Sequence, residues 1–314
     1  MSSVTSEHRI GWVGTGRMGY ALVERFLAAG CDVSVQNRTR AKAEPLGKDG
    51  ATIVDSPAEL ADRDIVFTMV AGSADLIEVV TGANGILSRE GIAPQIIVDS
   101  STVSSAAGEE VRAAAAAVGT SVVAAPVSGN PSVVRSGKLT SVASGPREAF
   151  DTARPYLELY GASVTYVGDG EVARLVKICH NLLLGVVTQS LAEIIVLAEK
   201  AGVPRADFMH FINQSVMGSI FSRYKTPAIV NLDWTPTFTG HLLRKDFELG
   251  LEAARKLDVP LPVAALVHQI VVEFIGNGLG EGDFMRLLEL EARGAGLDLE
   301  PENQDVSDGL EPSD

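Results

Sequence analysis

Three glycines near the N-terminus constrain the fold of this chain more than any other feature. Gly14, Gly16 and Gly19 follow the apolar run Arg9–Val13 and open a helical pattern over Met18–Ala29. Glycines at this spacing permit a tight turn from strand to helix and close packing of the helix on the strand. The pattern therefore predicts a strand–turn–helix unit at the start of a mostly parallel sheet.

Further apolar runs alternate with helical patterns up to about residue 168. The runs predicted as strands are Asp32–Gln36, Ile65–Val70, Ile96–Asp99 and Val122–Ala124. This rhythm is typical of a doubly wound α/β sheet, the Rossmann arrangement, with helices on both faces. Ligands bind such sheets beyond the carboxyl ends of the strands. We therefore expect an α/β domain over residues 8–168.

The second half of the chain shows helical periodicity throughout. Helices are predicted over 171–201, 205–213, 219–229, 240–257, 262–277 and 282–294. We expect an all-helical domain over 169–296, joined to the first domain by the long helix that starts near Glu171.

Charge and cysteine content exclude several classes of protein. The formal net charge of −14 argues against general affinity for nucleic acid or for an anionic membrane. Residues 297–314 carry acidic side chains, no basic ones and two prolines, so we expect a disordered acidic tail. Two distant cysteines, Cys31 and Cys179, form neither a disulfide framework nor a zinc set. With no signal-peptide pattern at the N-terminus, we expect a cytoplasmic protein.

The glycine turn and the end of the second strand together point to a dinucleotide. Gly16 lets the backbone approach a pyrophosphate, which the helix N-terminus favours. The second strand ends in Asn37-Arg38-Thr39, with no carboxylate for a free ribose hydroxyl. The Arg38 guanidinium is suited to a 2′-phosphate, so we expect NADP(H) rather than NAD(H). The alternative is that Arg38 is merely solvated and Asn37 accepts a free ribose.

Two later motifs carry candidate substrate chemistry. Ser128-Gly129-Asn130 follows a strand, and such a loop can hold a carboxylate or be a simple turn. Lys177 and Asn181 are four residues apart on the apolar long helix, so they share one face. Desolvation lowers the pKa of a lysine toward neutrality, which suits proton transfer. The alternative is a lysine whose charge reaches solvent at the helix edge.

Together with a fourth motif, Phe238 followed by Lys245-Asp246, these features resemble the β-hydroxyacid dehydrogenase family over residues 8–295. The resemblance implies hydride transfer between a nicotinamide and a small β-hydroxy acid or semialdehyde. It implies a catalytic role for Lys177, with Asn181 positioning the substrate and Ser128, Gly129 and Asn130 binding it. The cofactor contacts that it implies are Gly14, Thr15, Gly16, Arg17, Met18, Gly19, Asn37, Arg38, Thr39, Val70, Ala71, Thr102, Phe238, Lys245 and Asp246.

Departures from the family pattern leave the substrate open. Asn130 stands where a glycine is usual, His180 where an asparagine is usual, and Ala124-Ala125 replaces an acidic-Ala pair. Two alternatives are kept: an imine reductase-like enzyme, against which Lys177 counts, and a non-catalytic NADP-binding module. The resemblance also implies a homodimer or homotetramer.

Overall fold

The computed structural model describes residues 7–311. The chain forms two compact units, Met1–Lys177 and Ile178–Asp314. The change from one unit to the other lies within the long helix α7 (Val172–Lys200). The boundary predicted at residue 168 is upstream of this point, in the loop before the helix.

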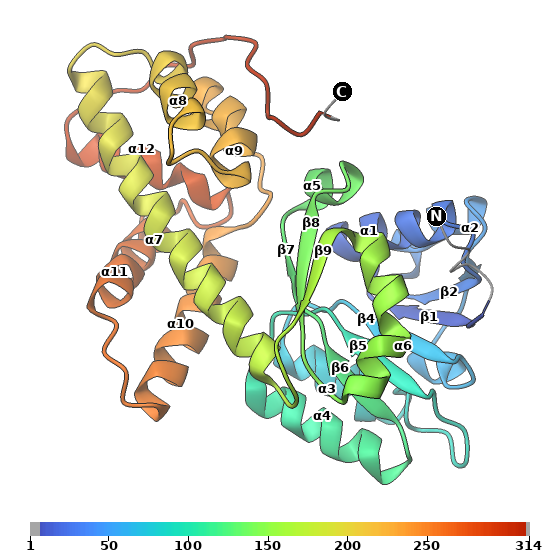
Figure 1. Cartoon of the computed structure of the whole chain (residues 1–314). Coiled ribbons are helices and arrows are strands. Elements are labelled where there is room, and N and C mark those ends of the chain that lie inside the picture. The colour runs from blue at the N-terminus through green and yellow to red at the C-terminus, as the bar shows by residue number, and fades with distance from the viewer. Residues whose placement is uncertain (1–6, 312–314) are drawn as a thin grey trace. The chain divides into compact units, whose positions relative to one another are not determined.

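A six-stranded parallel sheet forms the centre of the first unit (Figure 1). Its strand order is β3-β2-β1-β4-β5-β6. Strands β2 and β3 are added on one side of β1, and β4 to β6 on the other, so the order of strand addition reverses between β1 and β4. The strands are β1 (Ile10–Val13), β2 (Val33–Gln36), β3 (Thr52–Ile53), β4 (Ile65–Thr68), β5 (Ile96–Asp99) and β6 (Ser121–Ala124). The predicted doubly wound sheet is confirmed, and the carboxyl ends of β1 and β4 flank the reversal at which such folds bind ligands.

Alternation along the strands builds two different cores. Val13 and Val66 belong to an apolar cluster with residues of α3 (Ser73–Thr81) and α4 (Ser105–Ala117). The next residue along β4 is Phe67, which faces the opposite side because side chains alternate in a strand. Its ring stacks on Trp12, with centroids 5.4 Å apart, and packs against Phe26 of α1 (Arg17–Ala28). The sheet is therefore covered by helices on both faces.

A second, three-stranded sheet was not predicted. It has the order β7-β8-β9, formed by β7 (Val127–Ser128), β8 (Leu139–Ala143) and β9 (Gly161–Tyr166). The short helix α5 (Pro131–Arg135) lies between β7 and β8, and α6 (Arg147–Leu157) lies between β8 and β9. The Tyr160 hydroxyl makes a 2.9 Å hydrogen bond with Ser100 Oγ, next to the end of β5. Burial raises the pKa of this phenol, so it stays a neutral bonding group.

The second unit is helical, as predicted. After α7 it contains α8 (Arg205–Gln214), α9 (Ile220–Asn231), α10 (Gly240–Lys256), α11 (Pro262–Gly276) and α12 (Leu287–Gly294). Its helices enclose two apolar clusters, one around Phe247 and Phe274 and one around Met209 and Met285. By length and composition α7 is apolar enough to cross a membrane, but half of its most apolar window is buried in the protein.

Short elements complete the first and second units. They are α2 (Glu44–Lys48) and the 3₁₀ turns η1 (Arg40–Lys42), η2 (Pro57–Leu60), η3 (Glu158–Tyr160) and η4 (Phe284–Arg286).

The acidic tail differs from the disordered segment that its composition predicts. Leu297 and Leu299 pack against the cluster that contains Met209. Farther along, Glu302 N donates to Val230 O at 3.1 Å, and the Glu302 carboxylate accepts from Arg205 N and Ala206 N at 2.5 and 3.1 Å. The described part of the tail is therefore docked on α8 and α9, while 312–314 lie outside the described residues.

Candidate active site

The glycine turn after β1 is built to leave one backbone position open. Gly14 has a φ of +96°, and a Cβ there would lie 2.2 Å from Met69 O. A Cβ on Gly19 would lie 1.9 Å from Gly14 O, whereas one on Gly16 would meet nothing within 4 Å. Gly14 and Gly19 are thus required by the fold. The space beside Gly16 is available to a ligand.

The start of α1 and the preceding Thr15 bring polar groups to that space. Gly16 occupies the N-cap position, so no side chain caps the helix. The first N–H groups of a helix lack partners within it, and they favour an anion. Thr15 Oγ1 is also buried, with no hydrogen-bond partner among the described residues. These groups fit the pyrophosphate of a dinucleotide.

At the end of β2, two neighbouring side chains have distinct partners. Asn37 Oδ1 accepts from Thr15 N at 2.9 Å, and its Nδ2 donates to Thr39 O at 2.9 Å. Asn37 therefore fixes the glycine turn against the strand end. The Arg38 side chain is 91% exposed and pairs with Asp75 at 3.2 Å, so its guanidinium lies at the surface of this region.

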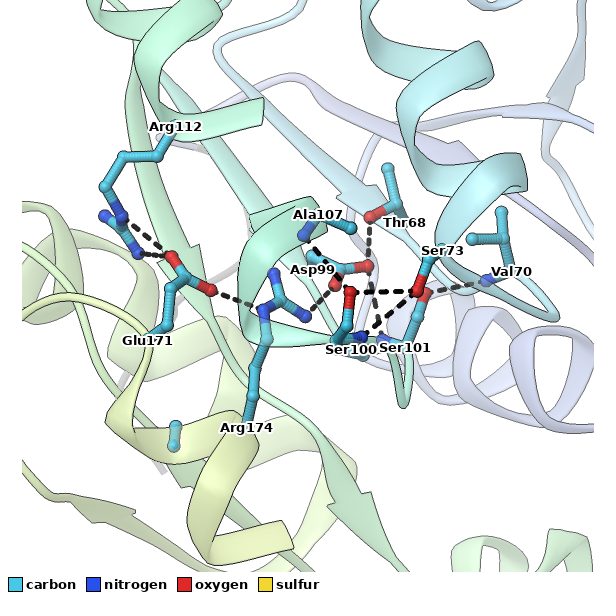
Figure 2. A network of polar contacts seen from close by, with 12 residues as sticks. Thr68, Val70, Ser73, Asp99, Ser100, Ser101, Ala107, Arg112, Glu171 and Arg174 are labelled. Carbon is cyan, nitrogen blue, oxygen red and sulfur yellow. Dashed lines mark hydrogen bonds and ion pairs between the residues drawn. The ribbon is translucent and has the colours of Figure 1, made fainter. Parts of the chain in front are cut away.

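The loops after β4 and β5 are joined through a buried carboxylate. Asp99, the last residue of β5, accepts from Thr68 Oγ1 at 2.7 Å and from Ser101 N at 3.2 Å. Ser101 Oγ in turn accepts from Val70 N at 2.8 Å (Figure 2). The two segments predicted to border the cofactor, Val70-Ala71 and the one that contains Thr102, are therefore held in one hydrogen-bonded frame.

The same carboxylate anchors the start of α7. Arg174 Nη1 donates to Asp99 Oδ2 at 2.5 Å, and Arg174 Nε donates to Glu171. Arg112 Nε and Nη2 donate to the second oxygen of Glu171 at 2.8 and 2.6 Å (Figure 2). Burial alone would lower the pKa of the Arg174 guanidinium, but the charges of Asp99 and Glu171 outweigh this effect and raise it.

Lys177 lies one helical turn beyond Arg174. It is the last residue of the first unit and is buried, with 7% of its surface exposed. Residues three apart on a helix are neighbours on its surface, so Lys177 follows Arg174 along one face of α7. The predicted proton-transfer lysine is therefore carried by a helix whose first turn is fixed to the end of β5.

In the helical unit the structure joins two of the predicted residues. Asn181 Nδ2 donates to Asp246 Oδ2 at 2.5 Å, and both side chains are buried. His180 Nδ1 lies 2.9 Å from Asn181 Oδ1. Lys245 Nζ is 3.4 Å from Asp246, and the Phe238 ring packs on Phe284 with centroids 5.6 Å apart. Asp246 is thus the centre of a polar cluster at Asn181.

The predicted substrate loop combines a strand end with a helix cap. Ser128 ends β7, and Gly129 has a φ of +142°, where a Cβ would lie 2.7 Å from Leu139 Cδ1. Asn130 is the N-cap of α5, and its Oδ1 accepts from Val133 N at 3.0 Å. The residue that departs from the family pattern thus caps a helix through its Oδ1.

Sequence analysis did not identify Arg174, Glu171 and Arg112 as site residues. Glu171 and Arg174 stand at the start of the helix that carries Lys177, which was a usable signal. Arg112 gave none, since it lies on α4 directly before a run of alanines.

The sequence matches two family models that together cover most of the chain. Residues 9–168 match the NAD binding domain of 6-phosphogluconate dehydrogenase. Residues 168–290 match the NAD-binding region of NADP-dependent 3-hydroxyisobutyrate dehydrogenase.

Individual relatives are similar over most of their length. Glyoxylate/succinic semialdehyde reductase 2 of Arabidopsis thaliana is 30% identical over 285 residues, covering 89% of this chain and 78% of that one. A crystal structure of 3-hydroxyisobutyrate dehydrogenase from Salmonella typhimurium has a TM-score of 0.82 at 27% identity and covers 90% and 100% of the two chains. Psf3, solved in complex with NADP+ and 2-OPP, has a TM-score of 0.81 at 27% identity, with 90% and 99% covered.

Proposed function

Because this chain belongs to the β-hydroxyacid dehydrogenase family, which includes 3-hydroxyisobutyrate dehydrogenase, we propose that Lys177 is the general acid/base in the oxidation of a small β-hydroxy acid. The observation that carries the proposal is the burial of Lys177 one turn beyond Arg174, which is bonded to the end of β5. Ligands bind at this edge of such a sheet. A lysine held there is in reach of the reacting end of a dinucleotide.

In the proposed reaction, neutral Lys177 accepts the proton of the substrate hydroxyl as the carbonyl forms. When bound, the nicotinamide takes up the hydride that leaves the same carbon. In the opposite direction, protonated Lys177 donates its proton to the oxygen of a semialdehyde. Ser128 and Gly129 hold the substrate carboxylate, with Asn130 at the edge of the loop. Proton transfer by a positioned side chain contributes about 10²–10⁴-fold to the rate.

We propose NADP(H) as the preferred cofactor. The Arg38 guanidinium at the end of β2 is exposed, and the strand end offers no carboxylate to repel a 2′-phosphate. The relative Psf3 was solved with NADP+. Thr39 and the α1 N-terminus complete the polar contacts that the cofactor needs.

The test follows the absorbance of the reduced nicotinamide. Purified protein is mixed with NADP+ or NAD+ and with 3-hydroxyisobutyrate, glycerate, 4-hydroxybutyrate, 3-hydroxypropionate and serine in turn. We expect turnover with NADP+ and at least one acid, and a loss of about 10²–10⁴-fold in kcat in Lys177→Ala. Lys200→Ala, at the far end of the same helix, is the matched control and should keep the wild-type rate.

Full turnover by Lys177→Ala would refute the assigned role. If the wild-type protein reduces neither cofactor with any of the acids, the proposed reaction is refuted. A panel of cyclic imines with NADPH then tests the imine reductase alternative. NADPH binding without turnover on either panel would favour the non-catalytic module.

We also propose that the enzyme acts as a homo-oligomer in the cytoplasm. The exposed side chains Leu183, Val187, Ile194 and Leu197 follow one another at intervals of four, seven and three residues along α7. This spacing forms one stripe on a helix, and a second copy of the chain would cover it.

A further inference from the structure

The first turn of α7 is fixed to the rest of the first unit at three points. Arg174 contacts Asp99 at the end of β5, and Glu171 contacts Arg112 of α4. The third contact is made by Ser144 Oγ, which accepts from Ala173 N at 3.0 Å and donates to Gly170 O at 2.7 Å. The backbone that leads into Lys177 is therefore constrained from three directions.

The central ion pair of this anchor, Arg174 with Asp99, is fully buried, so its stability depends on its geometry. The Arg174 side chain is 1% exposed and that of Asp99 is not exposed at all. A buried ion pair is stable only when its geometry is good and its remaining groups are bonded. Nε and Nη1 of Arg174 meet this requirement, because the planar fork reaches Asp99 and Glu171 at once in a geometry that an ammonium group does not reproduce. Arg174 Nη2 is buried with no hydrogen-bond partner among the described residues.

The neighbouring helix is shaped around the same group. Gly108 of α4 faces the ion pair, and a Cβ there would lie 2.0 Å from Glu171 Oε2 and 2.5 Å from Arg174 Nε. The absence of a side chain at Gly108 thus gives the guanidinium its place between α4 and the end of β5.

One carboxylate consequently links the lysine helix to the loops beside the cofactor. Asp99 receives Arg174 on one oxygen, and Thr68 and Ser101 N on the other. We propose that Arg174, held by Asp99 and Glu171, is a positioning residue that sets Lys177 relative to the Val70 and Ser101 loops. This inference rests on the proposed function, in which Lys177 acts beside a nicotinamide bound at those loops. A misplacement of about 1 Å can cost a reaction about 10²-fold.

The test substitutes Arg174→Lys, which keeps the charge beside Asp99 but cannot bridge to Glu171. We expect kcat to fall about 10–100-fold while KM for NADP+ changes less than about twofold. The matched control is Arg205→Lys in the helical unit. Arg205 is equally buried and bonds Glu199 at 2.6 Å and the carbonyls of Ile229 and Val230 at 3.0 Å. A merely structural role predicts that both variants lower the melting temperature and leave kcat unchanged below it.

A double-mutant cycle shows whether Arg174 acts through Lys177. If it does, Arg174→Lys added to Lys177→Ala should lower the residual kcat by less than about twofold, because residues that act as a unit are not additive. A full additional 10–100-fold loss in the double variant would overturn the inference, as would wild-type kcat in Arg174→Lys alone.

A second measurement does not depend on turnover. Lysines are labelled with acetic anhydride over a pH series, and labelling of Lys177 is followed by peptide mass spectrometry, with Lys200 as the internal reference. We expect the pH of half-labelling at Lys177 to move by more than about half a unit in Arg174→Lys and to stay in place in Arg205→Lys. An unchanged midpoint would overturn the inference even if no acid is turned over. A moved midpoint without wild-type turnover would contradict only the proposed function.

Discussion

Two adjacent residues after β2 differ in what their side chains contact. Asn37 is bonded to the glycine turn and to Thr39, so its side chain stabilises the turn itself. Within residues 7–311, Arg38 is held by one exposed ion pair with Asp75, of a type worth about 0–1 kcal/mol. A 2′-phosphate can replace that partner at little cost. In the sequence-based alternative, Asn37 Oδ1 would accept from a free ribose hydroxyl with its second lone pair while it keeps its bond to Thr15 N.

We predict that Arg38→Ala weakens NADP+ binding and leaves NAD+ binding unchanged. Loss of a hydrogen bond to a charged group costs about 1.5–3 kcal/mol, which is about 10–150-fold in Kd. Asp75→Asn should have the opposite sign, tightening NADP+ by up to about fivefold because it removes the competing carboxylate. Titration calorimetry with both cofactors measures each effect. Equal losses for NADP+ and NAD+ in Arg38→Ala would contradict the assignment.

Much of the cofactor side of the site could be predicted from sequence, because its residues are neighbours in the chain. The glycine turn, Asn37 and Arg38 each sit at the end of a strand that periodicity reveals. Arg174 and Asp99 are 75 residues apart, and nothing local in either segment indicates that they meet. For Lys177, the spacing indicated only that it lies on the same helix face as Asn181. Its catalytic role came from the resemblance to a family. Long-range pairing is thus what the sequence alone did not reveal.

Among the elements, the long helices and the buried parallel strands were predicted closely, whereas the strands of the three-stranded sheet were missed. The predicted helix over 205–213 is observed as Arg205–Gln214, and the strand Ile96–Asp99 is observed unchanged. The strand β7 has only two residues, Val127–Ser128. It exists because it pairs with β8, a contact that no periodicity within two residues can indicate.

The tail shows the same limit from the opposite direction. Its composition predicts disorder, yet Glu302 lies at the N-terminus of α8, where Pro204 in the N-cap position offers no side-chain hydrogen bond. The carboxylate bonds two of the unpaired N–H groups there and complements the positive end of the helix. An acidic residue that composition assigns to solvent therefore acts as a helix cap supplied by a distant part of the chain.

We predict that Glu302→Ala destabilises the protein by about 0.5–2 kcal/mol, the usual cost of losing an N-cap. Urea denaturation followed by circular dichroism measures the change in unfolding free energy. Asp305→Ala is the matched control, because it removes a carboxylate from an exposed position in the tail. Equal stability of the two variants would show that the tail does not cap α8.

For the molecule as a whole, α7 belongs to both units and has two kinds of surface. One face carries the buried polar residues Lys177, Asn181 and Gln189. Another carries exposed apolar residues, with Leu183 62% and Leu197 71% exposed. A regular apolar stripe on a long helix is typical of a contact with another helix.

We predict that Leu183→Glu lowers the mass of the particle in solution. The wild-type protein should have a multiple of the chain mass of 33.0 kDa, and the variant should shift toward that single mass because a charge is placed in the apolar stripe. Size-exclusion chromatography with light scattering measures both. Val118→Glu changes an exposed apolar residue at the end of α4 and should leave the mass unchanged. A wild-type particle of 33.0 kDa would refute the proposed oligomer.

The two-sheet construction of the first unit has a consequence for how such an enzyme diversifies. Ser128 and Gly129 are carried by the three-stranded sheet, while the glycine turn, Val70 and Asp99 follow strands of the six-stranded one. Replacements around Ser128 therefore leave the frame around Asp99 untouched. Enzymes with this architecture can change the acid that they recognise while the dinucleotide and the lysine that transfers the proton stay the same. In directed evolution, a library confined to residues 128–136 should accordingly yield new substrate preferences with unchanged dinucleotide affinity.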